Sequence, residues 1–288
     1  MEILVLGGDM RYLEIIESLS SKHNVTLVGY KNTFINDSVK NTDISSVEID
    51  KFDVVILPIN GVMDKYLINC RFNNNPIKIP RDFFVGSKKD VLIFSGIPTP
   101  CLSYMLEVSD RNCIYMMQDK EVIKKNAIPT VEGIVADVIN NTEITLENSQ
   151  VLVFGYGNIG SLLVKYLKML GANVCVSIIK ESDKVLLDSS GISNFYSYNR
   201  DDLISAISNS DIIINTVPKT VISENLIRFI NPDSYVLDVS SHPHGIDQEV
   251  LAEYFIKSKL YLGIPGKIAP KTSGKILCKK IFDVMGDG

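Results

Sequence analysis

VLVFGYGNIG, residues 151–160, is the stretch of sequence that decides the fold of this chain. Four apolar residues typical of a strand lead directly into the pattern Gly-x-Gly-x-x-Gly. Residues 161–170 then carry leucines at helical spacing, and a second strand-like run begins at Asn173. Such a glycine pattern between a strand and a helix is typical of a dinucleotide-binding turn. The stretch therefore predicts a β-turn-α-β unit that binds a nicotinamide dinucleotide.

The glycines of this turn have separate physical roles. Gly155 permits the tight turn, Gly157 lets the backbone approach a pyrophosphate, and Gly160 allows the helix to pack closely. The pyrophosphate is expected at the helix N-terminus, where free N–H groups and the helix dipole favour an anion. The alternative is a glycine-rich turn that binds nothing. The predicted cofactor contacts here are Gly155, Tyr156, Gly157, Asn158, Ile159 and Gly160.

Composition narrows the class of protein. A chain of 288 residues, 45% of them hydrophobic, suggests two domains with sizeable cores. The net charge of −5 and the lack of a basic stripe argue against nucleic acid as a partner. No apolar run approaches the roughly eighteen residues of a membrane span. Residues 1–9 read as a first strand and not as a signal peptide, and the five cysteines are scattered, so we expect a cytoplasmic protein.

Strand-like apolar runs alternate with helical patterns along the whole chain. This alternation is typical of parallel sheets covered by helices on both faces. We therefore predict an α/β fold with two Rossmann-like, doubly wound parallel-sheet domains joined by crossing helices. The expected strands are Glu2–Leu6, Val25–Gly29, Val54–Leu57, Val91–Ser95, Cys113–Met116, Val151–Phe154, Val174–Ile178, Asn194–Ser197, Ile212–Asn215, Tyr235–Val239 and Leu260–Gly263.

The predicted domain boundary lies at Pro129, since proline disfavours helix at the residue before it. Thr130 is a good N-cap for a helix that crosses between the domains. Residues 1–128 form the substrate-side domain in this prediction, and residues 129–270 form the NADP-binding Rossmann domain. A last apolar-periodic helix within 271–288 has no strand after it, so we expect it to pack back on the first domain.

The choice of dinucleotide depends on the end of the second strand of the Rossmann unit. An acidic residue there binds the ribose 2′-hydroxyl of NAD, whereas a cation accommodates the 2′-phosphate of NADP. Lys180 occupies this place and favours NADP over NAD, although Glu181 follows it directly. The alternative for Lys180 is a solvent-exposed lysine. Another strand ends at Thr216, Val217 and Pro218, which we predict to line the nicotinamide-ribose side; an ordinary turn is the alternative.

Two groups of polar residues suggest a site for a small dicarboxylate. The first follows strand one, where Asp9 and Arg11 lie in a glycine-rich turn, and arginine is suited to bidentate pairing with a carboxylate. The second lies in a loop rich in glycine and proline, where Lys267, Lys271 and Thr272 precede or begin the last helix. Lysines and hydroxyls at a helix N-terminus can hold an anion. The alternative is simple N-capping by Thr272 or Ser273 beside exposed lysines.

A third group follows the strand that ends near Val239. It contains Ser240 and Ser241, predicted to contact the substrate, and then His242 and His244. Histidine is the usual acid or base at neutral pH, so His242 is our first choice for the proton acceptor. Glu132, in the first turn of the crossing helix, is the second choice, with helix capping as its alternative role. We expect no metal, since His-Pro-His lacks a third ligand.

Taken together, these motifs resemble the family of dipicolinate synthase A subunits. The resemblance rests on Gly-Gly-Asp-x-Arg at 7–11, Asn-x-Ile-Pro-Thr-x-Glu-Gly at 126–133, the glycine pattern at 155–160, and Pro-Gly-x-x-Ala-Pro-Lys-Thr-x-Gly at 265–274. It spans essentially the whole chain. One departure is His244, which stands where the family has glycine.

The resemblance implies an enzyme that oxidises dihydrodipicolinate to dipicolinate with NADP during spore dipicolinic acid biosynthesis. It further implies that the partner is a flavoprotein-like B subunit, that the chain forms a homo-oligomer, and that it acts in the mother-cell cytoplasm of a spore-forming bacterium. Two alternatives stay open. One is an enzyme like the D-2-hydroxyacid dehydrogenases, although their arginine after the strand at 235–239 is replaced by Ser240-Ser241-His242. The other is a non-catalytic NADP-binding subunit that regulates or scaffolds.

Overall fold

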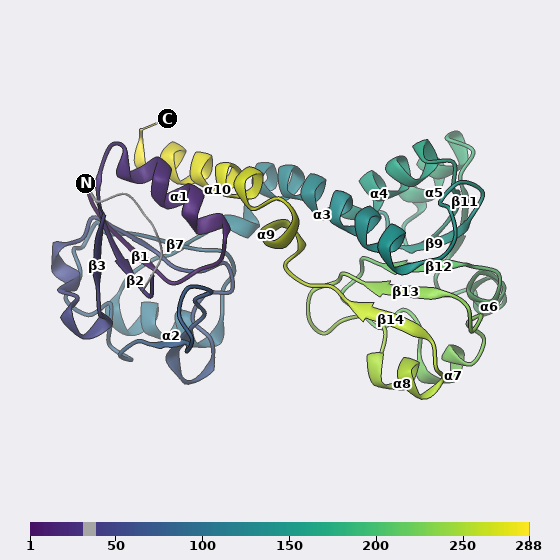
Figure 1. The fold of residues 1–288 in the computed structure, drawn as a ribbon, viewed down its shortest axis with the longest axis horizontal. Helices are drawn as coiled ribbons and strands as arrows, with labels where there is room; N and C mark the ends of the chain where they lie inside the picture. The colour runs from purple at the N-terminus through teal and green to yellow at the C-terminus, as the bar shows by residue number, and fades with distance from the viewer. Residues whose placement is uncertain (31–38, 288) are drawn as a thin grey trace. The chain divides into compact units, whose positions relative to one another are not determined.

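The computed structural model of the chain describes residues 1–30 and 39–287. Internal contacts divide the chain into two units, drawn in Figure 1. Unit 1 comprises Met1–Asn126 and Pro265–Gly288, and unit 2 comprises Ala127–Ile264. Each unit holds one six-stranded sheet in which all neighbouring strands are parallel. The predicted fold class is confirmed: two doubly wound parallel sheets in an α/β chain.

The sheet of unit 1 has the strand order β3-β2-β1-β4-β7-β8, which reverses direction between β1 and β4. Its strands are β1 (Glu2–Leu6), β2 (Asn24–Val28), β3 (Lys40–Thr42), β4 (Val54–Ile56), β7 (Leu92–Ser95) and β8 (Ile114–Tyr115). The sequence did not predict β3, nor the antiparallel pair of β5 (Leu67–Ile68) and β6 (Ile77–Lys78). The helices of this unit are α1 (Arg11–Ser20), α2 (Pro100–Ser109), α10 (Pro270–Met285) and the short η1 (Ile44–Ser46), η2 (Ile49–Lys51), η3 (Asp64–Tyr66) and η4 (Met116–Gln118).

Two hydrophobic clusters cover the two faces of this sheet. Alternate residues of β1 face opposite sides, so Ile3 and Val5 pack with α1 and α10, whereas Leu4 and Leu6 pack with α2. Figure 1 shows α1 and α10 on one side of the sheet and α2 on the other. Because both faces are covered, the strands are apolar throughout.

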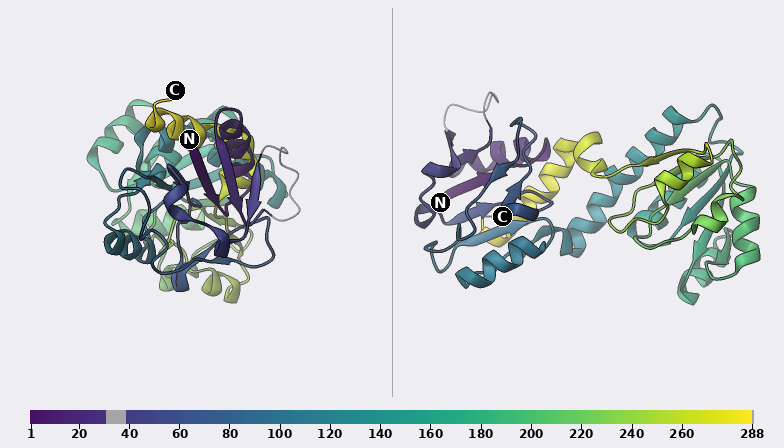
Figure 2. Two further views of the ribbon diagram at one scale, coloured as in Figure 1. Left: turned by 90° about the vertical axis from the view of Figure 1, so that its left-hand side faces the viewer. Right: turned by 90° about the horizontal axis from the view of Figure 1, so that it is seen from below.

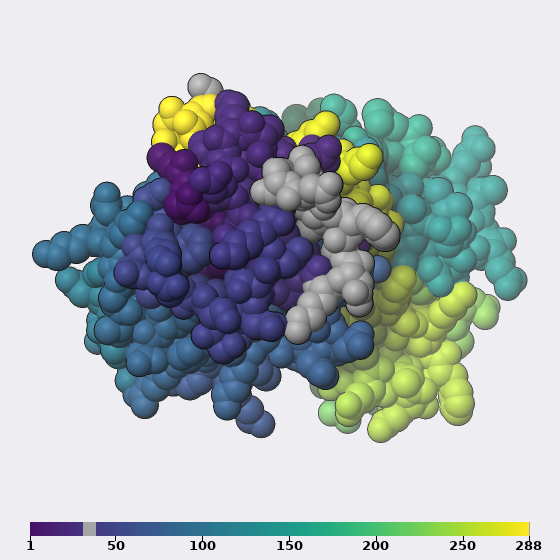
Figure 3. Space-filling view, turned by 60° about the vertical axis from the view of Figure 1, so that its left-hand side comes forward, coloured from purple at the N-terminus to yellow at the C-terminus, as the bar shows by residue number. Residues whose placement is uncertain are grey.

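The C-terminal helix α10 lies along α1, as both views of Figure 2 and the adjoining yellow and purple atoms of Figure 3 show. Its buried apolar residues join the core on the α1 side of the sheet, and Gly274 permits the close approach, since an added Cβ would lie 2.6 Å from the Arg11 carbonyl oxygen. The helix begins at Pro270, so the prediction of a start at Thr272 or Ser273 was wrong. Proline suits the first helical position because its φ is already helical. Gly288 of the predicted segment lies outside the described residues.

The sheet of unit 2 repeats the same order, β11-β10-β9-β12-β13-β14. This is the strand order of dinucleotide-binding domains, with its reversal between β9 and β12. Its strands are β9 (Gln150–Phe154), β10 (Asn173–Ile178), β11 (Ser193–Tyr196), β12 (Ile212–Asn215), β13 (Tyr235–Asp238) and β14 (Lys257–Leu260). Its helices are α4 (Asn158–Met169), α5 (Glu181–Ser189), α6 (Arg200–Ser208), α7 (Glu224–Ile227) and α8 (Gln248–Glu253), and α9 (Ile264–Ile268) begins where the chain returns to unit 1.

The core of unit 2 is also split by the sheet. One cluster joins the sheet to α3 (Lys120–Asn141), α4 and α5, and the other joins it to α6, α7 and α8. The last strand, β14, lies three residues before the predicted Leu260–Gly263, because its alternating Lys257-Ser258-Lys259-Leu260 reads as polar sequence although it is an edge strand.

Helix α3 begins ten residues before the predicted cap at Thr130 and contains Pro129 in its interior. The prediction that the helix starts only after Pro129 was therefore wrong. An interior proline removes one backbone hydrogen bond and costs about 3 kcal/mol. Burial on both sides of it offsets this cost: Val122 joins the core of unit 1, and Val131, Ile134 and Val138 join the core of unit 2.

Candidate functional site

The turn after β9 has the geometry of a dinucleotide fingerprint. Gly155 has φ +92°, which other residues rarely adopt. An added Cβ on Gly160 would lie 2.2 Å from the Gly155 carbonyl oxygen, so only glycine lets α4 start this close to the turn. Gly157 differs, because an added Cβ there would meet nothing within 4 Å. The space beside Gly157 is therefore open to a ligand.

The N-terminus of α4 is suited to bind an anion. Its cap residue is Gly157, which has no side chain to accept from the first-turn N–H groups. Those groups and the positive end of the helix dipole are thus available to a pyrophosphate. Tyr156 and Ile159 pack partly against the core, and Asn158 is exposed. These residues fit a dinucleotide.

The loop after β12 lies against this turn, at the point where the sheet order reverses. The Thr216 hydroxyl donates to the Phe154 carbonyl oxygen (2.8 Å), and the Val217 side chain would lie 2.6 Å from a Cβ on Gly155. Pro218 is exposed beyond them. The sequence-predicted residues 155–160 and 216–218 are thus brought together in one place.

Lys180 lies two residues beyond the end of β10, at the cap position of α5. Glu181 is the first residue of that helix. Both side chains are exposed at the carboxyl end of β10, where a Rossmann domain reads the adenosine ribose.

The loop after β13 is organised by Asp238, a fully buried carboxylate that sequence reasoning missed. Its Oδ1 accepts from the Ser240 amide (2.9 Å), the Ser240 hydroxyl (2.7 Å) and the Asn215 side chain (3.0 Å). Its Oδ2 accepts from the Gly245 and Ile246 amides (2.8 and 3.1 Å). A polar residue ending an apolar strand was the one signal in the sequence. The Ser240 hydroxyl, predicted to contact substrate, is held inside this network.

The two histidines of this loop differ in their surroundings. His242 and Ser241 are exposed. His244 is half-buried, has φ +68°, and its Nδ1 lies 2.9 Å from the Ser240 carbonyl oxygen. A carbonyl oxygen can only accept, so Nδ1 of His244 carries a proton and Nε2 is the acceptor of the neutral ring. The two rings lie edge to face at 5.7 Å.

Glu132 is exposed in the middle of α3. Its interpretation as a first-turn capping residue was wrong, because the helix begins at Lys120. Its role as second choice for the proton acceptor stays a prediction.

In unit 1, Arg11 is buried and paired with Asp9. Its Nε lies 3.0 Å from Asp9 Oδ1, and its Nη2 lies 2.6 Å from Oδ2. Burial alone would raise the pKa of Asp9, but the hydrogen bonds and charge of Arg11 outweigh it and lower that pKa. Burial alone would likewise lower the pKa of Arg11, and Asp9 raises it instead. The pair is therefore ionised at neutral pH.

The structure brings the loop before α10 to this pair. An added Cβ on Gly266 would lie 2.9 Å from Arg11 Nε and 3.0 Å from Asp9 Oδ2. Lys267 follows directly and is exposed, as are Lys271 and Thr272 in the first turn of α10. The substrate residues predicted from residues 9–11 and 267–272 thus come from two neighbouring segments of unit 1.

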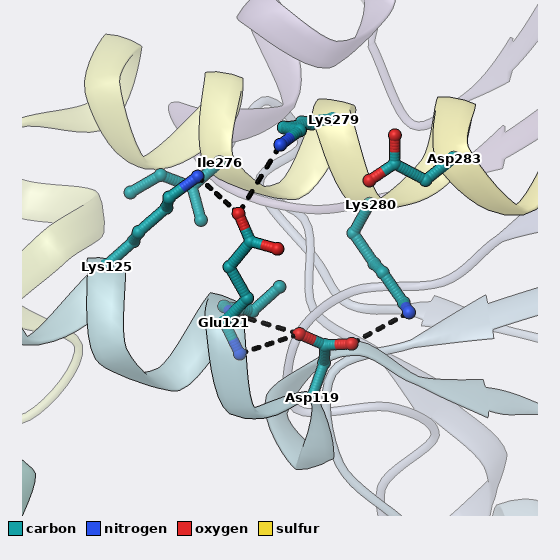
Figure 4. A pocket seen from close by; sticks show the side chains of 8 residues that line it. Asp119, Glu121, Lys125, Ile276, Lys279, Lys280 and Asp283 are labelled. Atoms are coloured by element: carbon teal, nitrogen blue, oxygen red, sulfur yellow. Dashed lines mark hydrogen bonds and ion pairs between the residues drawn. The ribbon is translucent and has the colours of Figure 1, made fainter. Parts of the chain in front are cut away.

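A different pocket between the start of α3 and α10 is too small for either ligand. It has a cavity volume of about 50 Å³, against the several hundred of a typical ligand site. Figure 4 shows that ion pairs fill it: Glu121 with Lys125 and Lys279, and Asp119 with Lys280. These contacts fasten α10 to α3 within unit 1.

Two functional classes find no support in the described part of the chain. None of its helices is long and apolar enough to cross a bilayer. Within residues 1–30 and 39–287, no group of three or more histidine, cysteine or acidic residues is arranged to hold a metal ion.

Residues 2–117 match the model of the N-terminal domain of the dipicolinate synthase A subunit. The resemblance to the A subunits of dipicolinate synthases is confirmed. The protein of this name from Bacillus subtilis (strain 168) is 29% identical over 290 residues, which cover 100% of this chain and 96% of that one.

Solved structures agree with this. The crystal structure of the dipicolinate synthase A subunit from Bacillus halodurans has a TM-score of 0.93 at 27% identity, covering 100% of this chain and 98% of that one. The crystal structure of its counterpart from Bacillus subtilis has a TM-score of 0.89 at 28% identity, covering 100% and 96%. A transhydrogenase from Sinorhizobium meliloti, at 14% identity and a TM-score of 0.66 over 99% and 94% of the chains, shares the fold.

The second half has its own match. Residues 130–253 match the NAD binding domain of D-isomer specific 2-hydroxyacid dehydrogenases. This domain contains the fingerprint turn and the loops after β10, β12 and β13. The chain therefore carries a nicotinamide-cofactor domain of the dehydrogenase type, which supports an oxidoreductase.

Proposed function

We propose that this chain oxidises dihydrodipicolinate to dipicolinate with NADP, as the A subunit of a dipicolinate synthase. The observation that carries the proposal is the likeness, along the whole chain, to two Bacillus proteins of that name. Unit 2 is the proposed NADP-binding domain and unit 1 the proposed substrate-side domain, with α10 as part of it.

NADP is the proposed cofactor, with NAD as the alternative. The open backbone at Gly157 and the uncapped N-terminus of α4 support pyrophosphate binding there. Lys180 is exposed at the carboxyl end of β10 and is proposed to pair with the 2′-phosphate. The nicotinamide, when bound, supplies the acceptor for a hydride from the substrate ring.

The remaining chemistry is a proton transfer. Conversion of the dihydropyridine ring to a pyridine removes one hydride and one proton, and aromatisation favours the product. His242, exposed in the loop after β13, is the proposed proton acceptor, with Glu132 as second choice. The proposed substrate contacts are Asp9, Arg11, Lys267, Lys271 and Thr272 in unit 1 and Ser240 and Ser241 in unit 2.

The relatives are named as A subunits, which supports a complex of this chain with the B subunit of a dipicolinate synthase. We also propose a homo-oligomer located in the mother-cell cytoplasm of a spore-forming bacterium. Co-purification of the two proteins at a fixed ratio, followed by light scattering, measures the assembly. A chain that stays monomeric and fails to retain the B subunit contradicts this part.

Turnover tests the proposal directly. Purified protein, alone and then with the B subunit, is supplied with freshly generated dihydrodipicolinate and NADP. We expect NADPH and dipicolinate to form in equal amounts. Failure of both preparations, while NADPH still binds, would favour the non-catalytic NADP-binding subunit.

A second candidate is a dehydrogenase of small 2-hydroxy acids, favoured by the match of residues 130–253. Against it, Ser240-Ser241-His242 follows β13 where those enzymes place an arginine. A panel of D-2-hydroxy acids separates the two candidates, because we expect none of them to be oxidised.

A further inference from the structure

Residues 69–71 lie against the first turn of unit 1. The Gly8 amide donates to the Asn69 carbonyl oxygen (2.9 Å), and the Arg71 amide donates to the Gly8 carbonyl oxygen (2.9 Å). Although this turn is rich in glycine, its backbone is therefore satisfied by protein. Unlike Gly157 in unit 2, Gly7 has no space for a phosphate, because an added Cβ would lie 2.5 Å from the Asn69 carbonyl oxygen. The end of β1 is thus left to side-chain recognition.

The same contacts hold Arg71 beside Asp9. Gly8 and Cys70 form a parallel bridge, so the next residues on the two segments, Asp9 and Arg71, are neighbours. Cys70 is buried and its thiol lies 3.1 Å from the Gly29 carbonyl oxygen. Phe72 stacks on Tyr30 with ring centroids 4.9 Å apart. Arg71 is therefore an exposed residue on a backbone that is fixed on both sides.

The charges at this place leave Arg71 available. Arg11 is committed to Asp9 through Nε and Nη2, and the two charges balance. Arg71 makes no ion pair and no side-chain hydrogen bond with the residues that the structure describes. Its charge is nevertheless felt by the Asp9 carboxyl, whose pKa it helps to lower after the larger effects of burial and of Arg11. The net charge of the three groups is +1, supplied by Arg71.

We propose that Arg71 binds one carboxylate of a small dicarboxylate at the carboxyl end of β1, as a second cation beside Arg11. The inference rests on the proposed function, from which the dicarboxylate comes. Arginine suits this role because its planar fork pairs with a carboxylate through two hydrogen bonds. The end of β1 is also where the sheet order reverses, which is the usual ligand position in such sheets. Arg71 is then a specificity residue that distinguishes a dicarboxylate from a monocarboxylate.

The test compares two ligands that differ by one carboxylate. Dipicolinate and picolinate are titrated by calorimetry into the full chain with saturating reduced cofactor, in metal-free buffer. We expect the unmodified protein to prefer dipicolinate. Arg71→Gln should weaken dipicolinate roughly ten- to a hundredfold and leave picolinate nearly unchanged, as for loss of one charge-assisted pair. Arg71→Lys should recover part of the preference.

Lys78→Gln is the matched control, because Lys78 is an exposed cation on the neighbouring strand β6. It should leave both affinities unchanged. If Arg71→Gln keeps the preference for dipicolinate, or weakens both ligands equally, the inference about Arg71 is overturned while the proposed function stands. If the unmodified protein shows no preference for the dicarboxylate, both are overturned.

Discussion

At the scale of single residues, Asp238 explains how the loop after β13 keeps its conformation. One carboxylate without solvent exposure accepts from Ser240, Asn215, Gly245 and Ile246. A buried charge is tolerated only when such donors surround it. An added Cβ on Gly245 would lie 2.2 Å from the Asn215 Nδ2, so the glycine makes room for this network. Asp238 thus positions the loop that carries both histidines.

His244 adopts a left-handed backbone at φ +68°, in a position where the related family has glycine. His244→Ala keeps the unfavourable φ and loses the bond to the Ser240 carbonyl, whereas His244→Gly removes the unfavourable φ. We expect the alanine variant to be less stable than the glycine variant by about 1–2 kcal/mol. Urea unfolding of both variants measures the difference. Equal stabilities would mean that the loop does not keep this backbone in solution.

His242 is the proposed proton acceptor. His242→Asn keeps a polar side chain of similar size but removes the base, so we expect kcat to fall by roughly 10²–10⁴-fold. NADPH binding should not change, which fluorescence titration checks. Glu132→Gln is the comparison for the second choice. A loss of less than about threefold for His242→Asn would demote it to an orienting role.

Lys180 is the proposed reader of the 2′-phosphate. Lys180→Ala should weaken NADPH by about 1.5–3 kcal/mol and leave NADH nearly unchanged, since one charge-assisted contact is lost. Lys168→Ala, an exposed lysine in the last turn of α4, is the control. Tighter binding of NADH than NADPH to the unmodified protein would instead assign the ribose contact to Glu181.

At the scale of elements, the start of α3 and the length of α10 depend on each other. Asp119 Oδ1 accepts from the Glu121 and Val122 amides (2.9 and 3.1 Å), and its Oδ2 pairs with Lys280 of α10 (2.7 Å). At the other end, the Tyr235 hydroxyl donates to the Asp137 carboxylate (2.6 Å), which fixes α3 to β13 in unit 2. These contacts, with the buried apolar face, let α3 continue through Pro129.

Asp119 should therefore contribute a pH-dependent share of stability. Asp119→Ala removes the cap and should cost about 0.5–2 kcal/mol, whereas Asp119→Asn keeps the cap acceptor and loses only the ion pair. The hydrogen bond to Lys280, followed by the α3 amides, lowers the pKa of Asp119 in the folded protein.

A lowered pKa in the folded state means that the ionised form stabilises folding. The contribution is full above the ordinary pKa of 3.8 and is lost as the pH falls through the lower folded value. Denaturant unfolding at neutral pH and near pH 3 measures it. A difference between the native protein and Asp119→Asn that grows on acidification would contradict this sign.

At the scale of the whole molecule, the two units have separate hydrophobic cores. The clusters built on β1 and its neighbours contain only residues of unit 1, and those built on β9 contain only residues of unit 2. Two cores of this kind can unfold in separate steps.

Cofactor binding should then act on one step. NADPH at a hundred times its Kd should stabilise unit 2 by about 2.7 kcal/mol, and the transition of unit 1 should move little. Calorimetric melting with and without NADPH measures both transitions. A single transition, or an equal shift of two, would show that the units unfold together.

The sequence by itself determined the fold class, the alternation of strands and helices and the fingerprint turn. These follow from local patterns: apolar runs, glycines at fixed spacing and residues that begin or end helices. The same patterns misplaced the start of α3, because a proline that locally disfavours a helix is outweighed by burial against residues far away in the chain.

Only the tertiary structure decided which polar groups meet. The pairing of Arg11 with Asp9 under Gly266, the network of Asp238 with Asn215 and Gly245, and the placing of Arg71 beside Asp9 join segments separated in sequence. A pattern of residues shows that a side chain is charged, but its partner depends on how the chain returns to it. For that reason the cofactor turn could be predicted from sequence, whereas the partners of the predicted substrate residues could not.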